Sequence, residues 1–152
     1  MTEQFTILIA DRNPHVRQFL GRELTAEGYR VELAKDGREV MKMLDLKKPP
    51  DLLILDLEVP HVSGLEILRE LQHRREPRLP VVVHTFLTDY ANHPVVQKAA
   101  AFVEKTGNNI DNFKAVIMDV LRKWYPKQKD QHNMKQVKST VFNQKGGHSV
   151  PS

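Results

Sequence analysis

The stretch Asp51-Leu52-Leu53-Ile54-Leu55-Asp56 sets four consecutive apolar residues between two acidic ones. A short run that is apolar at every position is typical of a strand buried on both faces, as in the centre of a parallel sheet. Asp56 then lies at the rim of a core, where unpaired carboxylates are seldom kept. The stretch therefore predicts a central strand that ends in a functional carboxylate.

Other apolar runs occur on both sides of this stretch and alternate with helical patterns. The predicted strands cover residues 6–10, 29–33, 52–55, 80–84 and 101–104. In the second strand Tyr29, Val31 and Leu33 alternate with charged residues, which is typical of a half-exposed edge strand. The alternation of strands and helices indicates a parallel sheet with helices on both faces and right-handed crossovers. We therefore predict an α/β domain built on a doubly wound, five-stranded parallel sheet.

Helical patterns fill the segments between the strands. A first helix is predicted from Pro14. At the start of a second helix, Asp36 and Glu39 have the spacing of a capping box. Residues 92–100 have only a weak pattern, so a short fourth helix is expected. The last helix has the most regular apolar stripe and ends before Pro126.

The net charge of the chain comes from its last residues. Lysine and arginine number 23 and aspartate and glutamate 19, which gives a net charge of +4. Residues 127–152 hold five lysines against one aspartate, so residues 1–126 are neutral. The scattered Val137, Val141 and Phe142 are too few to form a core. We predict one domain over 1–126 and a flexible basic tail over 127–152, with electrostatic contact to an acidic partner as the alternative.

The composition excludes several classes of protein. The chain has no cysteine, which excludes disulfides and thiolate metal sites. Its seven histidines show no spacing typical of a metal site. No apolar run approaches the length of a membrane span, and the first residues do not resemble a signal peptide. We therefore expect a cytoplasmic protein that has no membrane segment.

Four polar residues follow the predicted strands at the edge where parallel strands place their carboxyl ends. Asp11 comes after the first strand, Asp56 after the third, Thr85 after the fourth and Lys105 after the fifth. Ligands of doubly wound sheets bind at this edge. A carboxylate, a hydroxyl and an ammonium group gathered there suit phosphoryl transfer to the carboxylate. Each residue has a structural alternative, such as helix capping by Asp11, but four such coincidences are less expected than one site.

The chain resembles the receiver domains of bacterial two-component response regulators over residues 5–124. The matching stretches follow one another on the expected elements: Ile7-Leu8-Ile9-Ala10-Asp11-Arg12-Asn13-Pro14, Asp51-Leu52-Leu53-Ile54-Leu55-Asp56-Leu57-Glu58-Val59-Pro60, Ser63-Gly64-Leu65-Glu66, Val83-His84-Thr85 and Phe102-Val103-Glu104-Lys105. The resemblance implies the flavodoxin-like strand order 2-1-3-4-5. It also implies a free-standing signalling domain without a DNA-binding domain.

The resemblance implies a role for each matching residue. Asp56 matches the phosphoacceptor, Thr85 the switch hydroxyl and Lys105 the phosphate-binding lysine, and Phe102 matches an aromatic residue whose rotamer follows that hydroxyl. The implied partners are a histidine kinase or phosphotransfer protein and an unknown downstream protein. The surface of the fourth helix, fifth strand and fifth helix would bind that protein or form a homodimer. Such a domain acts by conformational change and not by enzymatic turnover.

Arg12 is the main departure from the family. Asp11 matches one of the family's acidic pair, but Arg12 stands where the family usually has its principal magnesium ligand. Either Glu58 completes a weakened magnesium site with Asp11 and Asp56, or Arg12 pairs with Glu58 or Asp56 and partly imitates the cation. We favour the second hypothesis, because a tethered charge loses less entropy than a captured ion and arginine suits bidentate contacts with carboxylates.

Two other functions stay open at this point. Arg12 also fits a pseudo-receiver, a domain of the same fold that binds partners without being phosphorylated. The stretch Asp56-Leu57-Glu58-Val59 loosely resembles the nucleophile motif of haloacid-dehalogenase-type phosphatases, in which the second acid is the general acid. That motif belongs after the first strand of a larger domain, whereas here it follows the third strand of a small one. The phosphatase is therefore the weaker alternative.

Overall fold

A computed structural model of the protein describes residues 4–74, 78–106 and 109–126. Residues Gln4–Val120 form one compact unit, which contains the whole sheet, and the last turn of the final helix, from Leu121 on, belongs to a second unit. The predicted tail over 127–152 lies outside the described residues. The domain boundary predicted after Pro126 therefore stays a prediction.

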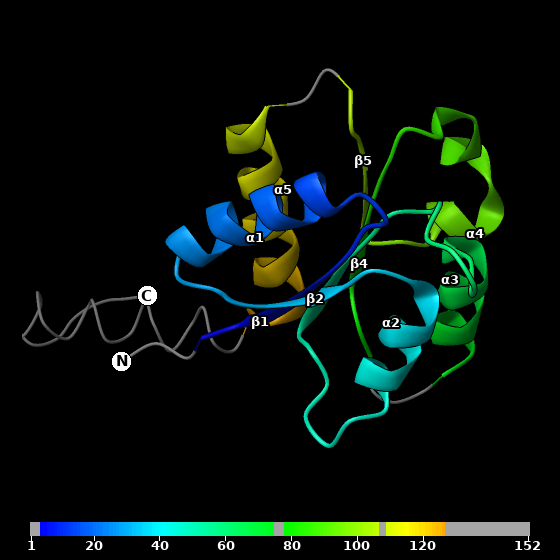
Figure 1. Ribbon diagram of the computed structural model, residues 1–152, viewed down its shortest axis with the longest axis horizontal. Helices are drawn as coiled ribbons and strands as arrows, with labels where there is room; N and C mark the ends of the chain where they lie inside the picture. The colour runs from blue at the N-terminus through cyan, green and yellow to red at the C-terminus, as the bar shows by residue number, and fades with distance from the viewer. Residues whose placement is uncertain (1–3, 75–77, 107–108, 127–152) are drawn as a thin grey trace, which may run out of the picture. The chain divides into compact units, whose positions relative to one another are not determined.

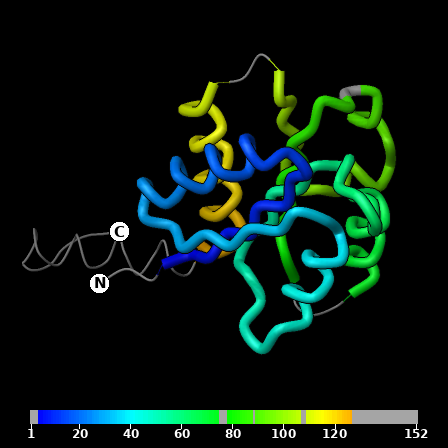
Figure 2. The backbone as a smooth tube through the Cα atoms, viewed as in Figure 1, coloured from blue at the N-terminus to red at the C-terminus, as the bar shows by residue number. Residues whose placement is uncertain are grey.

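The strands form a five-stranded parallel sheet. They are β1 (Thr6–Ala10), β2 (Arg30–Ala34), β3 (Leu52–Leu55), β4 (Val81–Thr85) and β5 (Ala101–Glu104). Their spatial order is β2-β1-β3-β4-β5, which confirms the predicted flavodoxin-like sheet. The bounds predicted for β1, β3 and β5 are confirmed, whereas β4 is shifted by one residue and includes Thr85. The path of the chain through the sheet can be followed by colour in Figure 2.

Helices cover both faces of the sheet. They are α1 (Pro14–Ala26), α2 (Gly37–Leu44), α3 (Gly64–His73), the 3-10 helix η1 (Thr88–Asn92), α4 (Pro94–Gln97) and α5 (Ile110–Trp124). Figure 1 shows α1 and α5 on one side of the sheet and α2, α3 and α4 on the other. The fourth helix is indeed short, since α4 has four residues. Within the described ranges, no helix is long and apolar enough to span a bilayer.

The helix caps differ in detail from the prediction. The Asp36 carboxylate accepts a hydrogen bond from the Glu39 amide at 2.9 Å, and this bond holds the pKa of Asp36 below its usual value. The Glu39 side chain, however, accepts from the amide of Lys35, one residue before the cap. A complete capping box occurs instead at the start of α3, where Ser63 and Glu66 each accept from the other's amide at 3.2 Å.

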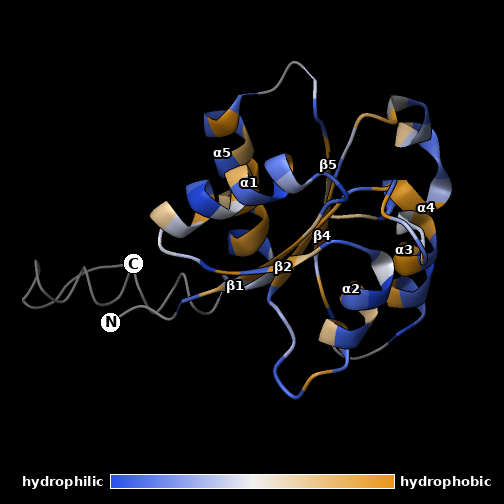
Figure 3. Ribbon diagram, in the orientation of Figure 1, coloured by the Kyte–Doolittle hydropathy of each residue, from blue (hydrophilic) through white to orange (hydrophobic). Residues whose placement is uncertain are grey.

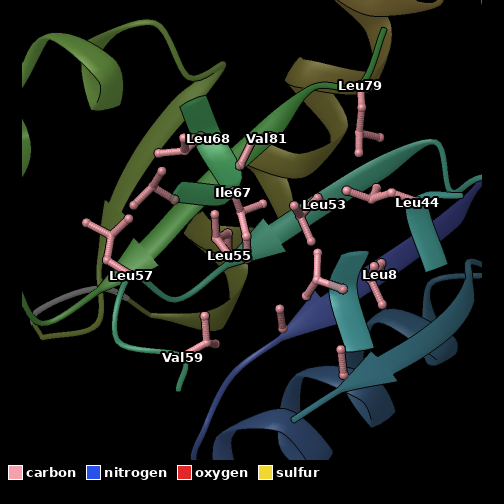
Figure 4. Close-up of a cluster of buried hydrophobic side chains, with 14 of the residues drawn as sticks. Leu8, Leu44, Leu53, Leu55, Leu57, Val59, Ile67, Leu68, Leu79 and Val81 are labelled. Carbon is pink, nitrogen blue, oxygen red and sulfur yellow. The ribbon is translucent and has the colours of Figure 1, made fainter. Parts of the chain in front are cut away.

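The core forms where alternate strand residues meet the helices. Side chains of β1, β3 and β4 that point to the α2 and α3 side make one continuous cluster, which Figure 4 shows with Leu8, Leu53, Leu55, Ile67 and Leu68 among its members. Figure 3 shows the hydrophobic colour concentrated along the central strands, whereas the helices carry both colours. Each fully buried Leu or Ile contributes about 1.5–3 kcal/mol. This burial makes the sheet a rigid base for the loops at its carboxyl edge.

The edge strand β2 is less regular than predicted. Tyr29 lies outside the strand, and Leu33, one of the alternating apolar residues, is 39% exposed. Only Ala34 is buried within the strand. The difference arises because β2 pairs with β1 alone, so neither of its faces is covered as fully as those of a central strand.

Candidate functional site

The backbone of the sheet brings the predicted site residues to one edge. The amide of Asp56 donates to the carbonyl of Ala10 at 2.9 Å, and the amide of Lys105 donates to that of Thr85 at 3.0 Å. Both bonds continue the parallel ladder one residue beyond the strands. Asp11, which follows β1 directly, therefore lies beside Asp56. The sequence prediction of a shared edge is confirmed for these residues.

Three of the site residues form a buried cluster of charges. The Lys105 ammonium lies 2.8 Å from Asp11 Oδ2 and 3.3 Å from Asp56 Oδ2. The side chains of Lys105, Asp11 and Asp56 are 6%, 2% and 0% exposed. Asp56 Oδ2 has an ion-pair distance to Lys105 but no hydrogen bond of acceptable direction. One cation thus compensates two carboxylates in a place of low dielectric, where charge is costly unless it is paired.

Burial and pairing act against each other on Asp11. Burial raises the pKa of its carboxyl group above the usual value, and repulsion from Asp56 acts in the same direction. The hydrogen bond from Lys105 and a 2.8 Å bond from the amide of Asn13 oppose the rise in the pKa without cancelling it. Among the groups that lower the pKa of Asp11, Lys105 has the largest effect.

The loop after Asp56 is fixed close to the Asp56 carboxylate. Asp56 Oδ1 accepts from the amide of Glu58 at 3.0 Å, which leaves the carboxylate in one orientation. The amide of Gly64 donates to the carbonyl of Leu57 at 3.3 Å. A Cβ atom at Gly64 would lie 2.6 Å from the Leu57 Cα, so a side chain cannot be placed there without moving the loop. This explains why a glycine begins α3.

The two predicted switch residues lie on the same face of neighbouring strands. Thr85 is fully buried, and its hydroxyl oxygen accepts from the amide of Leu87 at 3.1 Å. Phe102 pairs in register with Val83, two residues before Thr85, and packs partly buried against the core cluster. The placement is compatible with coupling between the two side chains, whose switching stays a prediction.

Arg12 and Glu58 form a second ion pair at the rim of the site. The Arg12 guanidinium lies 3.5 Å from Glu58 Oε1, and the two side chains are 56% and 28% exposed. Glu58 is thus paired outside the cluster that holds Asp11 and Asp56. Within the described residues, no three acidic or histidine side chains converge in a way that suits a metal ion. Asp11, Asp56 and Glu58 are not gathered as the predicted three-ligand magnesium site in this arrangement, because Glu58 faces Arg12 and the two aspartates face Lys105. Magnesium binding by these residues stays a prediction.

Two aromatic side chains lie next to the cluster, and only one of them was predicted from the sequence. His84 packs at the sheet end as expected, with its ring 4.9 Å from that of Phe113. Burial, together with the nearby charge of Lys105, lowers the pKa of His84 to about 4. Phe86 was not predicted as part of the site, yet its ring centre lies 5.3 Å from the Lys105 ammonium. Its position directly after Thr85 was the one available signal.

The sequence matches the family model of the response regulator receiver domain over residues 7–120. Response regulator RR06 of Streptococcus pneumoniae is 43% identical over 84 residues, which cover 55% of this chain and 37% of RR06. Response regulator MprA of Mycolicibacterium vanbaalenii is 40% identical over 79 residues, which cover 52% of this chain and 33% of MprA. The match thus spans about a third of the length of these curated relatives.

Solved structures agree with this assignment. Response regulator TrrA of Thermotoga maritima, in complex with Mg(2+)-BeF, is 30% identical with a TM-score of 0.70, and the match covers 78% of this chain and all of TrrA (100%). TrrA in complex with histidine kinase ThkA matches with a TM-score of 0.68 and 30% identity, covering 78% of this chain and 99% of TrrA. Because the family model covers most of the chain and the fold agrees, the protein belongs to the response regulator receiver domain family.

Proposed function

We propose that the chain is a phosphoacceptor in two-component signalling. Asp56 accepts a phosphoryl group from a histidine kinase or a phosphotransfer protein, and the modified domain changes its affinity for a downstream protein. The observation that carries this proposal is the buried Lys105 ammonium between Asp11 and Asp56. An ammonium held there is in place to neutralise the oxygens of a phosphoryl group on Asp56.

The transfer of the phosphoryl group to Asp56 requires few other groups of the protein. An oxygen of Asp56 attacks phosphorus and forms the new O–P bond, while the bond between phosphorus and the donor breaks and its electron pair leaves with the donor. Lys105 binds the transferred oxygens, and the Thr85 hydroxyl turns toward one of them. Such transfers depend mainly on positioning and charge neutralisation. The movement of Thr85 then lets Phe102 follow and changes the surface of α4, β5 and α5.

The family relationship supports the proposed donor. The related TrrA forms a complex with histidine kinase ThkA. We therefore propose a kinase of that kind as a partner of this chain, with the α4, β5 and α5 surface left for a downstream protein or a second copy.

The acceptor role is favoured over a phosphatase. A phosphatase with Asp56 as nucleophile needs a general acid, and Glu58 is the residue at the matching position. The Glu58 carboxylate pairs with Arg12 at 3.5 Å at the rim of the site, whereas a general acid has to reach the leaving group beside the nucleophile. We propose that the acyl phosphate on Asp56 hydrolyses slowly and that the domain does not turn over substrate.

A phosphorylation-independent interaction domain is the second candidate. The observation that favours it is that each of the three carboxylates lies within ion-pair distance of Lys105 or Arg12. A site whose carboxylates are all paired resembles a fixed structural network as much as a reactive one. The two candidates differ in whether Asp56 takes up phosphate.

Incubation of the full chain with the small phosphodonor phosphoramidate separates the candidates. We expect intact-mass spectrometry to show the gain of one phosphoryl group, and amide NMR signals around Thr85 and Phe102 to shift. Asp56→Asn should show neither change, while Asp111→Asn, an exposed acid on α5, should behave as the unmodified protein. Repeated release of inorganic phosphate would indicate the phosphatase, and no uptake in any condition would leave the interaction domain.

A further inference from the structure

We propose that Arg12 serves in place of a divalent cation when Asp56 accepts a phosphoryl group, so that phosphorylation of this protein does not depend on metal. The inference rests on the proposed phosphoacceptor function and names how the charge of the product is compensated. It is carried by three observations: the place of Arg12, the weakness of its present ion pair and the charge balance of the pocket.

The fold holds Arg12 close to the acceptor. Ala10 and Leu55 are paired in register on β1 and β3, so Asp11 borders Asp56 and Arg12 follows directly. The present partner of Arg12 is Glu58, whose own amide donates to Asp56 Oδ1 at 3.0 Å. The guanidinium is therefore tethered to the backbone segment that orients the acceptor carboxylate.

The ion pair between Arg12 and Glu58 is weak enough for Arg12 to leave Glu58 and bind a phosphoryl group on Asp56. Its 3.5 Å separation is long for a charge-assisted hydrogen bond, and more than half of the Arg12 side chain is exposed. Exposed ion pairs of this kind contribute little to stability. A phosphoryl group offers the guanidinium a dianion with several acceptor oxygens, which arginine binds in a bidentate manner. Exchange of Glu58 for the phosphoryl group is therefore favourable for Arg12.

The charge of the pocket is unchanged by this exchange. Before transfer, the carboxylates of Asp11, Asp56 and Glu58 face the cations of Lys105 and Arg12, which leaves one net negative charge. After transfer, Asp56 is an uncharged acyl group, and a dianionic phosphoryl group joins Asp11. If Glu58 turns to solvent, the two cations again leave one net negative charge. No additional cation is required to keep the balance.

Phosphorylation by phosphoramidate, with and without magnesium at constant ionic strength, tests the inference. In this reaction an oxygen of Asp56 bonds to phosphorus, the P–N bond breaks, and the leaving nitrogen takes its proton from water. We expect the unmodified chain to be labelled at the same rate, within about twofold, in EDTA and in magnesium. Arg12→Gln should be labelled at least about tenfold more slowly in EDTA, since a charge-assisted bond to the product is lost.

The substitution Arg12→Asp should give the opposite dependence. It removes the guanidinium and adds a carboxylate beside Asp11, so labelling should be slow in EDTA and rise with magnesium. Arg22→Gln, which changes an exposed arginine on α1 away from the site, is the matched control and should behave as the unmodified chain. Labelling of the unmodified chain only with magnesium, with no effect of Arg12→Gln in EDTA, would overturn the inference and leave the phosphoacceptor function intact.

A binding measurement gives a second readout that does not require labelling. Calorimetric titration with magnesium chloride should give weak or no heat for the unmodified chain and a clear isotherm for Arg12→Asp. Equal magnesium affinity in the two proteins contradicts the inference even if one of them is labelled poorly. Absence of labelling in every protein and condition contradicts the phosphoacceptor function itself, and the inference falls with it.

Discussion

Two lysines of this protein each bridge two carboxylates at nearly the same distances, yet their surroundings differ. Lys105 lies 2.8 and 3.3 Å from Asp11 and Asp56, and Lys114 lies 2.9 and 3.1 Å from Glu23 and Glu27. The side chains around Lys105 are almost fully buried, whereas those of Lys114 and its two partners are 19%, 34% and 44% exposed.

The comparison shows that ion-pair geometry alone does not define a site. Water screens the charges around Lys114, so that pair behaves as an ordinary surface contact between α1 and α5. At Lys105 the low dielectric makes each charge depend on the others. Burial raises the pKa of Asp11 against the pull of Lys105, and burial together with the charge of Lys105 lowers the pKa of His84. A buried and coupled cluster at the carboxyl edge of the sheet is the arrangement that suits chemistry.

The largest expected effect is that of Lys105→Met, which leaves two buried carboxylates without a cation. We expect a loss of about 3–5 kcal/mol in the free energy of unfolding at neutral pH, measured by urea denaturation. The loss should shrink on acidification, because protonation of one carboxyl group removes the repulsion. Lys114→Met is the matched control and should cost a small fraction of that amount. Equal losses in the two variants would break the comparison.

The second prediction concerns His84, whose pKa is lowered by burial and, to a smaller extent, by the charge of Lys105. Its pKa of about 4 in the folded protein lies below the unfolded value, so its contribution to stability is complete above about pH 6.5 and is lost as the pH falls toward 4. Between pH 7.5 and pH 5 this loss amounts to about 2 kcal/mol. His84→Leu should lose correspondingly less stability over the same range, whereas an identical pH profile in the two proteins would exclude His84 as the cause.

A smaller effect is expected from the loss of the hydrogen bond between the Leu87 amide and the Thr85 hydroxyl. Thr85→Val keeps the shape of the side chain but removes the acceptor for the Leu87 amide. We expect a loss of about 1 kcal/mol in the free energy of unfolding, while Thr85→Ser should retain most of the bond. If valine is tolerated without any loss, the hydroxyl does not hold the chain after β4.

The smallest expected effect is that of the exposed pair. Arg12→Gln should change the free energy of unfolding by no more than about 0.5 kcal/mol, because the pair is long and open to solvent. Added salt should change the stability of the unmodified and variant proteins to a similar extent. A loss as large as that of Lys105→Met would show that Arg12 is part of the buried cluster and does not exchange.

Sequence patterns predicted the bounds of β1 and β3 to the residue, because a run of apolar side chains that lies inside on both faces has few alternative positions. The bounds of the partly exposed edge strand β5 were also predicted to the residue, whereas the buried β4 is shifted by one residue. The half-exposed edge strand β2 is confirmed but lies one residue later than predicted, with the apolar Leu33 exposed. The prediction was wrong for the reciprocal bond of Glu39, which goes to Lys35. At an edge or a helix end several partners are within reach, and the local pattern does not choose among them.

The sequence by itself determined that Asp11, Asp56, Thr85 and Lys105 meet at one edge, since each follows or ends a strand of a parallel sheet and such strands end together. Only the tertiary structure decided how the charges divide: Lys105 binds both buried aspartates, and Arg12 pairs with Glu58 at the rim. The position of a strand follows from a local run of apolar residues, which can be recognised in the sequence. The choice of ion-pair partner depends on distance and burial among residues that lie far apart in sequence, and these are settled only when the chain has folded.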